Sequence, residues 1–204
     1  MPSFKIENRY KCVIAGVDEA GRGPWAGPVV AAAVILHRDL CPKGINDSKK
    51  LTKENREEIF AELINICDFG VGIVSEEMID EINILNATKL AMKQALVHLH
   101  NKPGVVLVDG NQGFELHKME IVPIVRGDSK SKSIAAASII AKVARDNIMA
   151  KLCHEYPHYG WSNNSGYGTP EHIAAIEKHG ICKHHRKTYA PIRKHLEERL
   201  IVNK

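Results

Sequence analysis

Two adjacent carboxylates, Asp18 and Glu19, follow a short apolar run and lead directly into a Gly-Arg-Gly-Pro turn at 21–24. Neighbouring negative charges repel each other, and Gly and Pro weaken the end of a strand, so this segment is costly for folding alone. A divalent cation would offset the repulsion, because hard cations take oxygen ligands from carboxylates. The glycines would let a substrate backbone approach closely. The segment predicts the floor of a metal-dependent active site; a solvated surface turn is the alternative.

Two further aspartates stand where other predicted strands end. Asp109 closes one apolar run, and Asp128 lies between another apolar run and a long helical pattern. If the strand that carries Asp109 pairs with the strand that carries Asp18, the two side chains arrive side by side, and Asp128 can approach from the helix N-terminus. Four carboxylates at one sheet edge would form a two-cation cage of the kind used in phosphoryl chemistry. Alternatively, Asp109 begins a turn and Asp128 caps the helix.

The elements that must position these acids alternate between β-branched runs and helical patterns, which indicates a layered α/β or α+β domain. We expect strands at 12–18, 28–36, 69–74, 104–109 and 120–125, and helices at 53–66, 86–100, 131–155, 170–179 and 190–202. Thr52 is the predicted N-cap of the first helix. Asp146 lies inside the long helix, where the spacing favours an ion pair with Lys142 over a place in the site.

The composition is that of an ordinary globular protein, with 204 residues, 44% hydrophobic and 25% charged. No apolar run approaches the length of about 18 residues that spans a bilayer, and the first residues lack a signal-peptide core. Five scattered cysteines suit a reducing compartment, so we expect a cytoplasmic protein without membrane association. The segment 178–194 is rich in Lys, Arg and His and has no acid, which suits either a polyanion or a solvated tail.

Six motifs, in order along the chain, resemble type 2 ribonuclease H, specifically bacterial ribonuclease HII. They are DEAGRGPWAGP (18–28), DSKKLT (47–52), VDG (108–110), GDSKSKSIAAASIIAKVARD (127–146), GYGT (166–169) and HRKTYAP (185–191). The resemblance runs from about residue 13 to 191. Thr188 and Tyr189 stand where the family more often has Ser and Phe. Arg22 and the early first strand favour ribonuclease HII over ribonuclease HIII.

The resemblance implies an α/β ribonuclease H-like fold, with a central five-stranded mixed sheet flanked by helices and a helical C-terminal extension. It implies a single domain over 1–204, with a catalytic core at about 10–156 and a helical part at about 157–204. The implied activity is endonucleolytic: hydrolysis of the RNA strand of RNA–DNA hybrids and incision at ribonucleotides embedded in duplex DNA. Two divalent cations, Mn²⁺ or Mg²⁺, would serve it, and the products would carry 5′-phosphate and 3′-hydroxyl ends. We expect a monomer with no obligate protein partner.

The resemblance also implies roles for individual residues. The family's metal-binding acids map onto Asp18, Glu19, Asp109 and Asp128, and its ribose-reading motifs map onto Gly21, Arg22, Gly23 and Tyr167. From the sequence alone, Tyr167 could instead pack on the sheet. Lys49 and Arg186 are candidate phosphate contacts. Two rival functions stay open: another two-metal nuclease such as a junction resolvase, and a non-catalytic nucleic-acid-binding protein.

Overall fold

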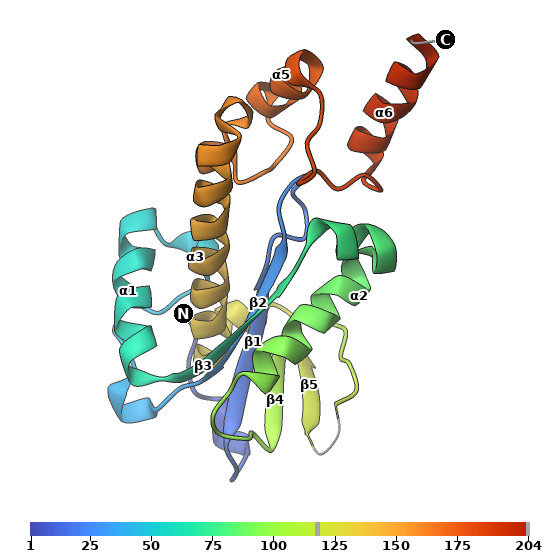
Figure 1. Cartoon of the computed structure of the whole chain (residues 1–204). Coiled ribbons are helices and arrows are strands. Elements are labelled where there is room, and N and C mark those ends of the chain that lie inside the picture. Colours follow the sequence, from blue (N-terminus) through green and yellow to red (C-terminus); the bar gives the residue numbers. More distant parts are fainter. Residues whose placement is uncertain (117–118, 203–204) are drawn as a thin grey trace.

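The computed structural model describes residues 1–116 and 119–202, and its centre is a five-stranded sheet (Figure 1). The strand order is β3-β2-β1-β4-β5. β1 runs antiparallel to β2 and parallel to β4, β2 is antiparallel to β3, and β5 is parallel to β4, so the sheet is mixed. The strands are β1 (Ile14–Ala20), β2 (Val29–Ile35), β3 (Asp68–Val74), β4 (Val105–Asp109) and β5 (Glu120–Ile124). The predicted fold class is confirmed.

Helices cover both faces of the sheet. α1 (Lys53–Ile66) and α3 (Lys132–Glu155) lie on one face and α2 (Glu76–Val97) on the other, and each face buries its own apolar cluster (Figure 1). Three C-terminal helices lie beyond one end of the sheet: α4 (Trp161–Asn164), α5 (Pro170–His179) and α6 (Ala190–Val202). The helical C-terminal extension is therefore present, whereas the division at about residue 156 stays a prediction. None of the helices in the described ranges has the length and apolar character needed to cross a membrane.

The side chains of β1 alternate between the two faces, as a strand requires. Val17 belongs to the core beneath α2. Gly16 faces α3 so closely that a Cβ there would overlap the backbone of Ser133 and Ile134. The same alternation sends Asp18 to the α3 face and the next residue to the α2 face. The structure extends this strand two residues past its predicted end, to Ala20, so Glu19 as well as Asp18 lies inside the regular alternation.

One helix begins earlier than the sequence predicts. α2 starts at Glu76 and ends at Val97, whereas we expected 86–100. Asn83 interrupts it with φ 64° and ψ 162°, and its side chain accepts hydrogen bonds from the N–H groups of Leu85 and Asn86. This kink breaks the apolar spacing, so the pattern reveals only the second half. The bounds of α1 and the N-cap at Thr52 are confirmed.

The start of α3 is held by a buried carboxylate from the N-terminal segment. Glu7 is 3% exposed and accepts hydrogen bonds from the Ser131 hydroxyl (2.6 Å) and the Ser133 N–H (3.0 Å). A negative charge at this end of a helix is favourable, because the helix dipole is positive there. The contact fixes the first turn of α3, just after Asp128.

Replacing Gly16 by Ala should lower the free energy of unfolding by about 2 kcal/mol or more, because backbone atoms cannot turn away from the new methyl group as a side chain could. Urea unfolding measures the change. Gly113→Ala is the matched control, because the nearest atom to its new Cβ would lie 3.6 Å away. Equal losses in the two variants would contradict the close packing of β1 against α3.

Candidate active site

Three aspartates from distant parts of the chain meet at the end of the sheet. Asp18, Asp109 and Asp128 each offer a carboxylate oxygen, and these oxygens all lie within 4.8 Å of one another. The parallel pairing of β1 with β4 sets Val17 opposite Val108, which brings Asp18 beside Asp109. The predicted pairing of these two strands is confirmed, and the structure brings the three aspartates together.

A short turn delivers the third aspartate. Asp128 lies in a 3₁₀ turn, η4 (Gly127–Ser129), between β5 and α3. The N–H of Gly127 donates a hydrogen bond of 2.6 Å to the Asp109 carboxylate. This bond ties the turn directly to the end of β4, so the position of Asp128 is set by Asp109 itself.

The three aspartates share a strongly negative environment, in which Asp18 is buried and Asp109 and Asp128 are partly exposed. Asp18 is 6% exposed. Burial raises the pKa of Asp18 well above its usual value, and the charges of Glu19, Asp109 and Asp128 raise it further. Burial also raises the pKa of Asp128, followed by the charge of Asp109. A divalent cation among these oxygens would relieve the repulsion, and carboxylate oxygens are the ligands that hard cations prefer.

Glu19 leaves the strand on the opposite face from Asp18 and is not part of the aspartate trio. Its carboxylate lies 3.4 Å from the Arg22 guanidinium. Burial raises the pKa of Glu19, although Arg22 opposes the shift. The predicted four-acid cage is thus three clustered aspartates with Glu19 beside them, since two consecutive strand residues cannot both point into one site from the same face.

Lys49 lies in the field of the acidic cluster. Burial alone would lower the pKa of Lys49, but the charges of Asp18, Asp47, Asp128 and Asp109 together raise it. Lys49 stands in the turn η3 (Ser48–Lys50) and is exposed. The structure therefore places this predicted phosphate contact at the acidic cluster, within reach of solvent.

Arg186 is fully buried and binds the glycine loop, residues 21–28, from the protein interior. Its guanidinium donates to the carbonyl oxygens of Gly21 (2.6 Å), Arg22 (3.1 Å) and Gly27 (2.7 and 2.9 Å). Its exposed fraction is 0%. The predicted phosphate contact at Arg186 is therefore wrong: all its donors face the protein, and a phosphate cannot reach them. The residue positions the loop instead.

A second buried arginine holds the other end of the same loop. Arg145 is 1% exposed and donates to the carbonyl oxygens of Ala26 (3.0 Å), Pro28 (3.0 Å) and Ser165 (2.9 Å). Burial lowers the pKa of Arg145 to about 10. Sequence reasoning missed this residue, although its spacing carried a signal: it follows Ala141 by four residues and so shares the buried face of α3. The predicted ion pair between Asp146 and Lys142 is confirmed, at 2.7 Å.

Tyr167 stands beside the glycine loop on a turn that is bonded to it. The Tyr167 side chain is half exposed, and a Cβ on Gly23 would lie 3.3 Å from the edge of its ring. The N–H of Trp25 donates to the Gly166 carbonyl at 2.8 Å, and the Trp25 ring packs so tightly on Gly168 that no side chain fits there. A hollow beside the acids is lined by Glu19, Gly21, Arg22, Gly23, Lys49 and Tyr167, among others. Most of the predicted substrate-binding residues therefore share one surface.

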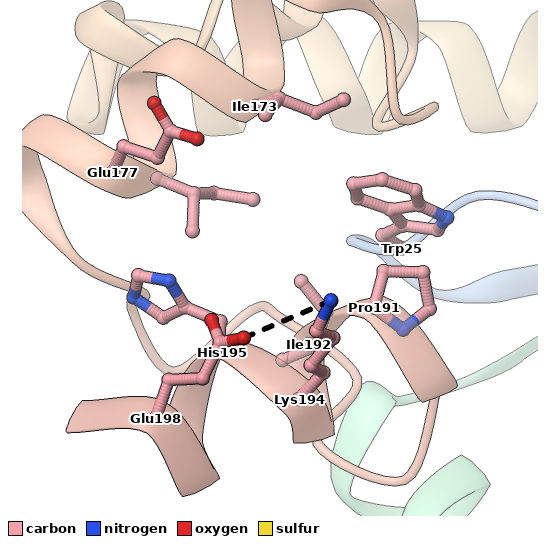
Figure 2. A pocket seen from close by; sticks show the side chains of 9 residues that line it. Trp25, Ile173, Glu177, Pro191, Ile192, Lys194, His195 and Glu198 are labelled. Atoms are coloured by element: carbon pink, nitrogen blue, oxygen red, sulfur yellow. Dashed lines mark ion pairs between the residues drawn. The ribbon is translucent and has the colours of Figure 1, made fainter. Parts of the chain in front are cut away.

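A separate cavity of about 240 Å³ lies between α5 and α6. Figure 2 shows Trp25 and Pro191 on one side of it and Glu177 and His195 on the other. The dashed line joins Lys194 to Glu198, an ion pair of 3.7 Å. None of the four candidate metal-binding acids lines this cavity, so it lies outside the candidate active site.

Comparisons with known proteins agree on one family. A family model described as Ribonuclease HII matches residues 15–192. The Ribonuclease HII of Wolbachia pipientis subsp. Culex pipiens is 54% identical over 193 residues, covering 94% of this chain and 98% of that protein. The Ribonuclease HII of Acetivibrio thermocellus is 55% identical over 182 residues, covering 88% of this chain and 70% of that protein.

Solved structures give the same result for the fold. The ribonuclease H2 of Pyrococcus horikoshii OT3 superposes with a TM-score of 0.75 at 33% identity, covering 91% of this chain and 97% of that one. The RNase HII of Archaeoglobus fulgidus, solved in a complex with PCNA, superposes with a TM-score of 0.76 at 30% identity, covering 87% and 95%.

Arg186→Lys should lower the free energy of unfolding by about 2 kcal/mol, because a lysine keeps the charge but cannot reach the loop carbonyls with a planar fork. Arg22→Lys is the control, since the exposed ion pair that it alters contributes at most about 1 kcal/mol. Urea unfolding of both variants checks the difference. A loss at Arg186 no larger than at Arg22 would contradict the positioning role.

Without divalent cations, the protein should lose stability as the pH rises above about 4, the usual pKa of an unfolded carboxyl. The folded pKa values of Asp18, Glu19 and Asp128 are raised, so the folded state holds these protons more tightly and its advantage fades as they leave. Asp18→Asn should weaken this trend and stabilise the metal-free protein near pH 7 by roughly 0.5–2 kcal/mol. Thermal unfolding in EDTA between about pH 5 and 8 measures both effects. Identical pH trends in the two proteins would contradict the predicted repulsion.

Proposed function

This chain belongs to the ribonuclease HII family and is therefore a metal-dependent ribonuclease H acting on RNA–DNA hybrids, and we propose that its cleavage centre is built from Asp18, Glu19, Asp109 and Asp128. The observation that carries the proposal is the trio of aspartates whose oxygens lie within 4.8 Å of one another. The trio lies at the end of the sheet, beside a hollow lined by Glu19 and the glycine loop. A scissile phosphate could therefore lie over the aspartates while its sugar occupies the hollow.

The proposed chemistry is hydrolysis with two divalent cations, Mg²⁺ or Mn²⁺, which would activate water and stabilise the leaving 3′ oxygen. Asp18 is the proposed bridging ligand, because it is the most buried of the acids and lies beside Asp109. Asp109, Asp128 and Glu19 would complete the two sets of ligands. The products would carry 5′-phosphate and 3′-hydroxyl ends.

We also propose that the glycine loop reads the 2′-hydroxyl of a ribonucleotide, including a single one embedded in duplex DNA. Arg186 and Tyr189 bind the Arg22 carbonyl from inside the protein, which turns the carbonyl away from the hollow. Within the described ranges, the N–H groups of Arg22 and Gly23 find no protein acceptor. An outward N–H can donate to the 2′-hydroxyl, which deoxyribose lacks. Tyr167 would stack on the neighbouring deoxyribose.

Lys49 would bind a backbone phosphate close to the cleavage centre. Its charge lies in the field of the four aspartates that raise its pKa, so a phosphate bound there would also be near the cations. Phosphate contacts of this kind set affinity and salt dependence and carry no sequence preference.

The decisive experiment incubates the protein with duplex DNA that contains one ribonucleotide, in Mg²⁺, Mn²⁺ or EDTA. We expect cleavage at the ribonucleotide with either cation and none in EDTA. Asp18→Asn should abolish cleavage, by at least about 10³-fold, while binding to an RNA–DNA hybrid stays within a few-fold. Equal cleavage of duplex DNA without any ribonucleotide would favour a junction-resolvase-like nuclease. Binding without turnover in either cation would favour a non-catalytic protein.

Gly23→Val should reduce cleavage at a single ribonucleotide more than Arg22→Ala does. A valine would fill the space between the loop and the Tyr167 ring, whereas alanine at position 22 leaves the backbone donors in place. Initial rates on the same duplex measure both. The reverse order would show that the Arg22 side chain, and not the loop backbone, reads the sugar.

A further inference from the structure

Two fully buried histidines form a continuous hydrogen-bonded chain beneath Tyr167. The Cys182 N–H lies 3.0 Å from Nδ1 of His185, and Nε2 of His185 lies 3.1 Å from Nε2 of His172. The indole N–H of Trp161 also points at Nε2 of His172, at 3.1 Å. Nδ1 of His172 lies 2.9 Å from the carbonyl oxygen of Tyr167. Both histidines are 0% exposed.

One assignment of protons satisfies every contact in this chain. The Cys182 N–H makes Nδ1 of His185 an acceptor, so its proton lies on Nε2 and is donated to His172. The lone pair on Nε2 of His172 accepts that bond and the Trp161 bond together, as a three-centre hydrogen bond. The proton of His172 therefore lies on Nδ1 and is donated to the Tyr167 carbonyl. Both rings are then neutral. Their burial agrees with this, since it lowers the pKa of His185 to about 3 and also lowers the pKa of His172.

The aromatic residues around the two histidines indicate that these rings do more than fill space. Tyr159 stacks on Trp161 with ring centroids 4.9 Å apart, and Tyr159 also meets His185 edge-on at 4.7 Å. Two polar rings in such an aromatic core cost free energy unless all their nitrogens are bonded. An apolar ring would fill the space of His172 without this cost, but would leave the Tyr167 carbonyl with the Thr169 N–H alone, at 2.8 Å.

We propose that His172, held in one tautomer by His185 and Trp161, is a positioning residue that sets where Tyr167 lies against the glycine loop. The inference rests on the proposed function, in which Tyr167 contacts the sugar at the RNA-to-DNA junction. A Cβ on Gly23 would lie 3.3 Å from the Tyr167 ring, so the gap between them is narrow, and a shift of the Tyr167 backbone opens or closes the space that the sugar enters. The chain of histidines has no bond to the aspartates. Its loss should therefore change discrimination between substrates and leave metal-dependent hydrolysis in place.

A pair of substitutions separates positioning from folding. His172→Asn keeps an N–H near Nδ1, which can still donate to the Tyr167 carbonyl, and loses the acceptor at Nε2. His172→Gln keeps an amide near Nε2 and loses the donor to Tyr167. Each removes one side of the ring's bonding, so we expect similar losses of stability from the two variants.

The readout is the ratio of two cleavage rates: a duplex with a single ribonucleotide against a uniform RNA–DNA hybrid. His172→Gln should lower this ratio about five- to tenfold, the effect of one lost hydrogen bond, while His172→Asn stays within about twofold of the wild type. An unchanged ratio in His172→Gln, or equal loss in both variants, overturns the proposal. Failure of the wild-type protein to cut the single-ribonucleotide duplex would instead overturn the proposed function.

A second measurement needs no variant. In ¹⁵N-labelled wild-type protein, nitrogen chemical shifts should show His172 protonated at Nδ1 only and His185 protonated at Nε2 only. His185 should stay neutral down to about pH 5, and His172 should gain a proton only below its usual pKa. The opposite tautomers, or titration of either ring near its usual pKa, would contradict the proton assignment proposed for His185 and His172. This test holds even if both His172 variants fail to fold.

Discussion

The constraint on which this structure depends is the crowding of like charges at the end of a parallel strand pair. The register of β1 with β4 sets Asp18 beside Asp109, and the turn before α3 adds Asp128. The rest of the fold offsets the repulsion. β2 is buried along its whole length, and small residues let α3 pack directly on β1 at Gly16. The carboxylate of Glu7 then secures the first turn of α3. The aspartates stay close together because packing fixes the backbone of the elements that carry them.

The two arginines below the glycine loop show how the fold holds charge on the other side of the site. Neither Arg145 nor Arg186 forms an ion pair among the described residues; backbone carbonyl groups bind both. Carbonyl dipoles directed at a buried guanidinium fix the course of the loop in a way that apolar packing could not. They also draw the carbonyl oxygens at both ends of the loop toward the protein interior. The polarity of the proposed sugar-binding surface is therefore a result of the charges beneath it.

The sequence predicted those features that depend on local pattern. Apolar β-branched runs located all five strands, Thr52 marked the start of α1, and the ends of two strands pointed to Asp109 and Asp128. It did not predict features that depend on distant contacts. Arg186 has the surroundings of a surface cation in sequence, and only the folded glycine loop supplies the carbonyls that bury it. The opposite directions of Asp18 and Glu19 required the true end of β1. The histidine chain joins segments that have no pattern in common.

One long helix connects the two halves of the site. The first turn of α3 follows directly from Asp128, and three to four turns later Arg145 grips both the glycine loop and, through Ser165, the turn that carries Tyr167. A helix rises 1.5 Å per residue and resists stretching, so the thirteen steps from Lys132 to Arg145 impose a spacing of about 20 Å along its axis. Under the proposed function, this rigid connection keeps the loop that recognises the sugar in a fixed place relative to the aspartates that cut the phosphodiester. The position of the cut would then follow from this fixed geometry, with no contribution from base sequence.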